Sequence, residues 1–233
     1  MKIGIVGDYN PSYPSQKATN DALIHSSEKL GIHIEWDWIP TSLISEQMDK
    51  IINMYKGFWI APGSPESVSG VLQIIQYSRE YNIPLLGTCG GFQNILIEYA
   101  RNKLMIQEAG HEELDPNASK LVVNKLTCSL VEQKGEIVIK NLSKVFGIYK
   151  NQKVTEQFRC NYGLNSEYQS QIDESGLRIV GADAQGNPRI IELPEHKFFI
   201  GTLFVPQLSS TLESPHCLIN SFIEHVCNYP KST

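Results

Sequence analysis

The chain has 233 residues, of which 41% are hydrophobic and 19% charged, the composition of a water-soluble globular protein. Its net charge is −5 and no basic block interrupts the sequence, which argues against nucleic acid or an anionic membrane as the main partner. No apolar run approaches the roughly 18 residues that a membrane span needs, and Met1–Val6 reads as a buried strand rather than a signal peptide. We expect a single cytoplasmic domain covering residues 1–233.

The first half of the chain alternates short apolar runs with segments of helical periodicity. The predicted elements are a strand at Lys2–Val6, a helix at Lys17–Leu30, a strand at Ile32–Trp38, a helix at Ser42–Tyr55, a strand at Gly57–Ala61, a helix at Ser67–Tyr81, a strand at Ile83–Leu86 and a helix at Phe92–Asn102. Strands separated by helices of this length predict a parallel sheet with helices on both faces.

The second half contains apolar runs with few helices between them. The predicted strands are Lys120–Leu130, Glu136–Ile139, Arg178–Asp183, Asn187–Leu193 and Phe198–Phe204, followed by a helix at Pro215–Val226. Such runs usually form antiparallel pairs beside the main sheet. The fold class is therefore α/β, a mostly parallel central sheet with extra antiparallel strands in the second half.

Five cysteines are an odd number without paired spacing, which is typical of free thiols in a reducing compartment. We find no CxxC motif and no Cys/His cluster, so we expect no metal and no cofactor.

The most informative segment is the turn from Gly87 to Gly91, which surrounds Cys89. A buried strand, a sharp turn of small residues and a helix start would push the Cys89 side chain outward, as at a nucleophile elbow. The helix N-terminus would stabilise a thiolate, and the Gly90 amide would face a developing oxyanion. A buried cysteine in an ordinary Gly-rich turn would show the same pattern.

Longer motifs resolve this ambiguity. The Gly-x-Cys-x-Gly turn resembles the elbow of class I glutamine amidotransferases, and four stretches resemble the glutaminase domain of CTP synthase. They are KIGIVGDY (Lys2–Tyr9), IPLLGTCGGFQNILIEYARN (Ile83–Asn102), EQFRCNYGLN (Glu156–Asn165) and IIELPEHKFFIGTLFVPQLSS (Ile190–Ser210). The resemblance covers nearly the whole chain and implies a three-layer, flavodoxin-like fold.

In that family a cysteine attacks the side-chain amide of glutamine, a histidine acts as base and acid, and a glutamate orients the histidine. Cys89 matches the cysteine. Val205 stands at the histidine position and Gln207 at the glutamate position. The resemblance therefore implies an incomplete catalytic triad, because valine cannot accept a proton and glutamine carries no charge.

The resemblance also implies a substrate pocket. Gly63 matches the oxyanion loop, although the following Pro65 removes a backbone donor there. The other matching positions are Gly90 in the oxyanion hole, Gln93 in the pocket, Glu113 for the glutamine α-amino group, and Asn161 in place of a glutamine-binding arginine.

Two residues are candidates for a substitute base. His111 lies two residues before Glu113, and Glu66 lies in the altered oxyanion loop. Each has a simpler interpretation: His111 as a solvent-facing loop residue and Glu66 as a favourable charge at a helix N-terminus.

We therefore expect a CTP synthase-like, cysteine-nucleophile hydrolase or amidotransferase that acts on glutamine or a related amide, imide or ester. The alternative is a catalytically degenerate homologue that binds a ligand or a partner. The ATP-using synthase half is absent from the sequence, so a separate synthase partner in pyrimidine nucleotide biosynthesis is a third possibility. The oligomeric state stays open, with a homodimer among the possibilities.

Overall fold

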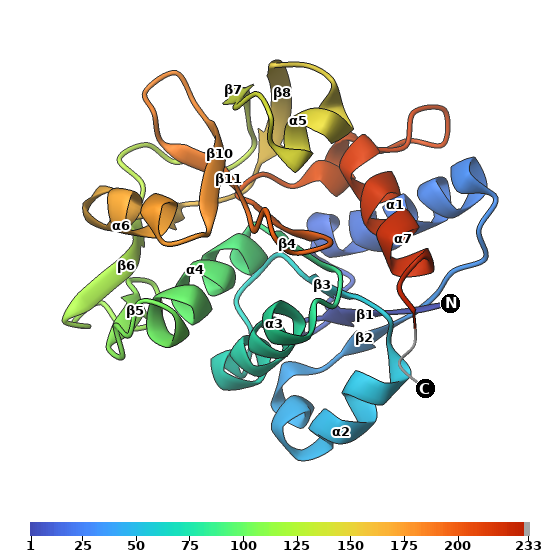
Figure 1. Cartoon of the computed structure of the whole chain (residues 1–233), viewed down its shortest axis with the longest axis horizontal. Coiled ribbons are helices and arrows are strands. Elements are labelled where there is room, and N and C mark those ends of the chain that lie inside the picture. The colour runs from blue at the N-terminus through green and yellow to red at the C-terminus, as the bar shows by residue number, and fades with distance from the viewer. Residues whose placement is uncertain (231–233) are drawn as a thin grey trace.

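The structure is a computed structural model that describes residues 1–230. A nine-stranded sheet forms its centre (Figure 1). One half of the sheet is parallel, in the order β2 (Glu35–Ile39), β1 (Lys2–Val6), β3 (Phe58–Ile60), β4 (Leu85–Thr88) and β12 (Phe199–Thr202). The other half continues antiparallel through β11 (Pro188–Glu192), β10 (Arg178–Ala182), β7 (Gln133–Ile139) and β8 (Lys153–Phe158). The predicted fold class is confirmed.

Helices cover both faces of this sheet (Figure 1). On one side α1 (Pro14–Leu30) packs against α7 (Cys217–Cys227). On the other side α3 (Val68–Tyr81) packs against both α2 (Ile44–Met54) and α4 (Gly90–Asn102). The chain reverses direction across the sheet after β2, so right-handed crossovers place α1 and α2 on opposite faces.

A smaller sheet lies beside α4. It contains β5 (Ala109–His111), β6 (Lys120–Lys125) and β9 (Tyr162–Leu164). The sequence predicted one long strand over Lys120–Leu130, but the ladder stops at Lys125. Two of its strands, β5 and β9, contact the side chain of Gln93, a residue predicted to lie in the pocket.

Several further boundaries differ from the predictions. Helix α1 begins at Pro14 rather than Lys17, since proline is well suited to the first turn of a helix. The helix predicted over Ser42–Tyr55 divides into a short 3₁₀ turn and α2, in which Gln47 has non-helical angles. Five helices and strands were not predicted: β5, β8, β9, α5 (Lys144–Tyr149) and α6 (Gln169–Glu174). The single-domain assignment stays a prediction, and its last residues, 231–233, lie outside the described residues.

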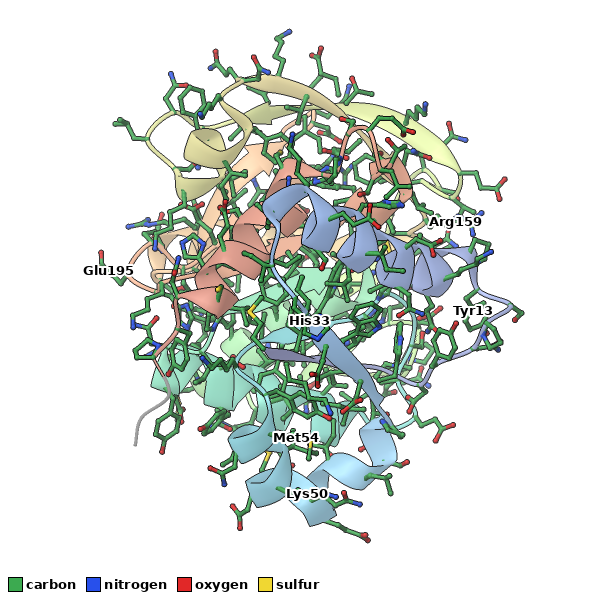
Figure 2. All side chains as sticks on the ribbon, turned by 90° about the vertical axis from the view of Figure 1, so that its right-hand side faces the viewer. Tyr13, His33, Lys50, Met54, Arg159 and Glu195 are labelled. Carbon is green, nitrogen blue, oxygen red and sulfur yellow. A yellow bond between two sulfur atoms is a disulfide. The ribbon has the colours of Figure 1, made fainter. Side chains whose placement is uncertain are left out.

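Apolar side chains from the sheet and helices fill the space between the layers, whereas Lys50 and Glu195 lie at the periphery (Figure 2). A buried ion pair also joins α3 to α4, because Arg79 Nη2 lies 2.7 Å from Glu98 Oε1. Within residues 1–230, no helix is both long enough and apolar enough to cross a bilayer.

The close packing of β3 against the start of α4 gives a first test. A methyl group added to Gly91 would overlap the carbonyl oxygen of Ile60, whereas one added to Gly147 in α5 would meet no atom within 4 Å. We expect Gly91→Ala to lower the free energy of unfolding by about 1–3 kcal/mol, the usual cost of overpacking. The control Gly147→Ala should be neutral or raise it by about 0.5–1 kcal/mol. Urea unfolding of the two variants checks this, and equal stabilities would contradict the packing described.

Candidate functional site

Cys89 occupies the connection between β4 and α4, in a backbone conformation that few residues adopt. Its φ is 53° and its ψ is −104°, outside the regions that side chains other than glycine favour. The N–H of Cys89 donates to the carbonyl of Thr202 at 2.8 Å, and its carbonyl accepts from the N–H of Gln93 at 3.3 Å. The strand partner and the following helix thus hold Cys89 in the strained geometry of a nucleophile elbow.

The glycines around Cys89 allow backbone segments to approach closely. A side chain on Gly90 would overlap the carbonyl oxygen of Gly63, and one on Gly87 would come within 2.6 Å of Ile95 Cδ1. Gly63 itself has φ of 108°, which favours glycine. The loop that contains Gly63 therefore lies directly against the first turn of α4, next to the Gly90 amide.

The carboxylate of Asp8 anchors this loop. Asp8 Oδ2 accepts the N–H of Glu66 at 2.8 Å and the hydroxyl of Thr41 at 2.7 Å, while Oδ1 accepts the N–H of Thr41 at 2.8 Å. The side chain of Glu66 is exposed and makes no hydrogen bond of its own within the described residues. Its backbone, rather than its carboxylate, takes part in the site.

Gln93 is held from two sides, one helical turn after Cys89. Its amide nitrogen donates to the carbonyl of Tyr162 in β9 at 2.9 Å, and its amide oxygen lies 3.0 Å from Nε2 of His111 in β5. Nδ1 of His111 accepts the N–H of Glu113 at 3.1 Å, so the ring proton is on Nε2 and points at Gln93. Both ring nitrogens of His111 are therefore engaged.

Burial adds to this constraint on His111, whose side chain is only 8% exposed. Desolvation lowers the pKa of His111 below its usual value, and the carboxylates of Glu113 and Glu112 oppose that shift. The neutral ring is thus favoured, with no free lone pair to accept a proton from Cys89.

The remaining predicted pocket residues lie at the surface. Glu113 is exposed, and one of its oxygens accepts the Ser64 hydroxyl at 3.0 Å, which links the Gly63 loop to the segment after β5. Asn161 is also exposed, and its backbone carbonyl accepts the N–H of Leu126 at 2.8 Å.

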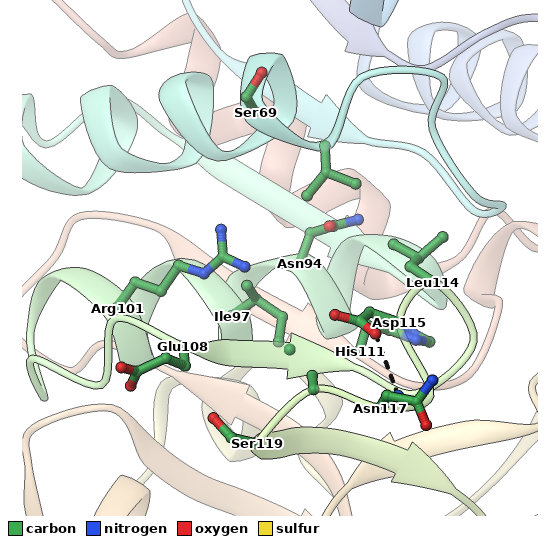
Figure 3. A pocket seen from close by; sticks show the side chains of 13 residues that line it. Ser69, Asn94, Ile97, Arg101, Glu108, His111, Leu114, Asp115, Asn117 and Ser119 are labelled. Carbon is green, nitrogen blue, oxygen red and sulfur yellow. Dashed lines mark hydrogen bonds between the residues drawn. The ribbon is translucent and has the colours of Figure 1, made fainter.

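A pocket of about 550 Å³ opens between α3, α4 and the loop after β5. Figure 3 shows His111 and Asn94 at one end of it and Arg101 and Glu108 at the other. Cys89 does not line this pocket. His111 connects this pocket with the region around Cys89, because it lines the pocket and also contacts Gln93.

The two residues that the resemblance aligns with the catalytic histidine and glutamate are part of the packed interior. Val205 is fully buried, and its N–H donates to the carbonyl of Gln157 at 2.8 Å. The Gln207 amide nitrogen donates to the Thr19 hydroxyl at 3.0 Å and lies 3.5 Å from that of Thr88, the residue before Cys89. Its amide oxygen is buried without a hydrogen-bond partner among the described residues. No ionisable group occupies either position.

The sulfur atoms of Cys89 and Cys160 are joined in a disulfide, with their Cα atoms 6.2 Å apart. The expectation of five free thiols is therefore wrong for this pair, whereas Cys128, Cys217 and Cys227 are unpaired. Sequence spacing could not reveal the bond, because 71 residues separate the partners and only the fold brings them together.

The sequence also missed a buried polar cluster between α5, β8 and the start of α7. Glu156 Oε1 accepts the Tyr149 hydroxyl at 2.7 Å and lies 3.0 Å from His216 Nε2. Desolvation, with Glu156 adding to it, raises the pKa of the neighbouring Cys217 to about 11. That thiol stays protonated near neutral pH and is a poor nucleophile.

Among the described residues, no group of three or more His, Cys, Asp and Glu side chains is placed to hold a metal ion.

Comparison with known families matches residues 15–225 to the class-I glutamine amidotransferase family. The CTP synthase of Nautilia profundicola is 32% identical over the whole chain, which covers 47% of that relative. The CTP synthase of Sulfolobus acidocaldarius is 32% identical over 96% of the chain and is covered to 44%. The chain thus spans about half the length of the curated relatives it matches.

Solved structures show the same fold. The glutaminase domain of Trypanosoma brucei CTP synthase, with bound acivicin, superposes with a TM-score of 0.89 at 22% identity, covering 99% of this chain and 95% of that one. A glutamine amidotransferase from Thermotoga maritima superposes with a TM-score of 0.62 at 9% identity, covering 97% and 98%. The three-layer architecture is therefore that of the amidotransferase fold.

The engagement of both nitrogens of His111 predicts how the Cys89 thiol responds to substitution. In reduced protein, His111→Gln should leave the pH midpoint of Cys89 alkylation by iodoacetamide in place, because His111 positions Gln93 and does not accept the proton. Glu66→Gln is the matched control at the second candidate base. A shift of about one pH unit or more in either variant would show a charge interaction with the thiolate and contradict this expectation.

Proposed function

The chain belongs to the class-I glutamine amidotransferase family, and on that premise we propose that Cys89 attacks glutamine or a related amide, imide or ester without ordinary glutaminase turnover. The observation that carries this proposal is the backbone of Cys89, with φ of 53° and ψ of −104°. A conformation of this kind costs on the order of 1–3 kcal/mol and persists only where its surroundings enforce it. An ordinary buried cysteine would not need it.

Two features support a reactive thiol in the reduced protein. Cys89 is the N-cap residue of the 13-residue helix α4, whose dipole favours a negative charge at that position. The Gly63 loop packs against Gly90, and we assign the backbone amides of these two segments as the donors to a tetrahedral oxyanion. Pro65, the departure from the family pattern, lies two residues beyond Gly63 and leaves this contact in place.

Turnover of an amide needs more than a thiolate. The leaving nitrogen must gain a proton, and a water molecule must lose one before it can hydrolyse the acyl-enzyme. Val205 and Gln207 can do neither, and His111 has both nitrogens engaged. Loss of general acid–base catalysis lowers rates by roughly 10²–10⁴-fold, and the loss is greater where a triad acts as a unit. Substrates whose leaving group needs no proton, such as esters, are favoured.

A second candidate is a degenerate homologue that binds a ligand or a partner protein. The packing of Gln207 favours it, since this side chain is fixed against Thr19 in α1 and Thr88 in β4. In this case the partner would be a synthase of the kind found in the CTP synthase relatives, which the domain would regulate by binding.

Covalent labelling tests the first candidate. We expect acivicin, the ligand in the related Trypanosoma brucei structure, to add stoichiometrically to Cys89 of the reduced chain, detected by peptide mass mapping. Cys89→Ser should abolish the adduct, and Cys128→Ser, at an exposed unpaired cysteine, should leave it unchanged. A reduced, folded chain that forms no adduct would favour the binding protein instead.

Restoring the triad tests whether the rest of the pocket is competent. The double variant Val205→His with Gln207→Glu should raise ammonia release from glutamine by about 10²-fold or more, because it returns a base and its orienting carboxylate. The hydroxyl of Thr88, which already accepts from Trp59 Nε1, has its own proton free for that carboxylate. Gln207→Glu alone returns the orienting carboxylate without the histidine that would exchange a proton with Cys89, and should give no gain; an equal gain from the single variant would refute this assignment of roles.

A further inference from the structure

We propose that Cys89 and Cys160 are a reversible thiol–disulfide pair through which peroxide switches the reactive thiol off. This inference deepens the proposed function, on which it rests for the importance of Cys89, but the chemistry of the pair requires no glutamine. The residues that bring the two sulfur atoms together, their burial and the surrounding backbone carry the proposal.

The fold places both cysteines against the same short segment at the end of β12. The carbonyl of Thr202 accepts the N–H of Cys89 at 2.8 Å, and the carbonyl of the next residue, Leu203, lies 3.0 Å from Cys160 Sγ. The carbonyl of Arg159 lies 3.8 Å from Cys89 Sγ. In the reduced protein the Leu203 carbonyl is the acceptor for the Cys160 thiol, and the Arg159 carbonyl is the acceptor for the Cys89 thiol.

The backbone near Cys160 is also fixed from its other side. Its carbonyl accepts the N–H of Leu130 at 3.1 Å, and the carbonyl of Asn161 accepts that of Leu126 at 2.8 Å. A Cα separation of 6.2 Å lies within the range that disulfides span. The pair can therefore open and close without any large movement of the chain.

The surroundings of the two thiols assign them different roles. Cys89 is 8% exposed and caps α4, so its thiolate is the form that the helix stabilises and is the one an oxidant can reach. Cys160 is 2% exposed and follows the last residues of β8 without a helix N-terminus of its own. We assign Cys89 as the peroxide-reactive thiol and Cys160 as the resolving thiol.

The chemistry balances with hydrogen peroxide as the oxidant. The Cys89 thiolate attacks one peroxide oxygen; an S–O bond forms, the O–O bond breaks, and hydroxide leaves and is protonated to water. The thiol of Cys160 then attacks the sulfenic sulfur; the S–S bond forms, the S–O bond breaks, and the departing hydroxide takes the thiol proton as a second water. A dithiol reverses the bond by exchange through a mixed disulfide, and is itself oxidised to a cyclic disulfide.

The disulfide changes what the site can do. When Cys89 is bonded to Cys160 it is no longer a thiolate and cannot attack a substrate. Acyl transfer therefore stops while the disulfide is present. The same bond protects Cys89 from the higher, irreversible oxidation states, because Cys160 consumes the sulfenic acid as soon as it forms.

The experiment uses the full chain, reduced and then treated with a small excess of hydrogen peroxide. Iodoacetamide marks the remaining thiols, and peptide mass mapping identifies them. We expect a linked Cys89–Cys160 peptide that has lost two hydrogen atoms, while Cys128 stays open to alkylation. Labelling of Cys89 by iodoacetamide should fall at least tenfold and recover fully with dithiothreitol. Two free thiols at Cys89 and Cys160 after the treatment would overturn the proposal.

The variant Cys160→Ser keeps the peroxide-reactive thiol but removes the thiol that would form the disulfide with it. Peroxide should carry its Cys89 to sulfinic or sulfonic acid, and dithiothreitol should not restore labelling; full recovery in this variant would refute the role of Cys160. Cys128→Ser is the matched control and should behave as the unaltered chain. Should Cys160→Ser fail to fold, the linked peptide of the unaltered chain still decides the question. Because iodoacetamide needs no glutamine pocket, the outcome does not depend on the acivicin result.

Discussion

The arrangement of the site depends on the strained backbone at Cys89. The parallel pairing of β4 with β12 fixes the N–H of Cys89 on the carbonyl of Thr202, and α4 must start at the next residue. Only a left-handed φ satisfies both requirements, which places the sulfur at the N-terminus of α4 and brings Gly90 against the Gly63 loop. The position of Gln93, one helical turn later, and through it that of His111, follows from the same turn.

Much of this could be predicted from the sequence because it depends on local pattern. The alternation of apolar runs and amphipathic segments predicted the parallel strands β1 to β4, whereas β12, expected among the antiparallel strands, pairs in parallel with β4. The small residues beside Cys89 predicted a sharp turn between a strand and a helix, as observed. What depends on contacts between distant segments could not be predicted. Examples are the bond between Cys89 and Cys160, the use of both nitrogens of His111, and the sheet that joins β5 and β9 through β6. Strand β8 was not predicted because a polar residue, Glu156, occupies one of its buried positions and breaks the apolar pattern.

The family relationship and the site differ in a consistent way. Backbone contacts hold the turn at Cys89 and the Gly63 loop beside it, whereas Val205 and Gln207 stand where the family resemblance predicts the side chains that move protons. Val205 and Gln207 are packed as interior residues, His111 positions Gln93, and Asp8 holds the Gly63 loop. Cys160 lies where it can bond to Cys89, and we propose that this bond controls the availability of the Cys89 thiol. The chain is an amidotransferase domain, and we propose that the reaction of its Cys89 thiol slows sharply once the covalent intermediate has formed.

The most direct measurement of this claim is pre-steady-state release of the chromophore from an activated γ-ester of glutamate, whose leaving group needs no proton. The account predicts a burst of one equivalent per reduced Cys89, followed by a steady state at least about 10²-fold slower, because acylation needs only the thiolate and deacylation needs a base. Rapid linear turnover without a burst would show that a base is present after all. The absence of any release would show that the thiol at the elbow is not a nucleophile.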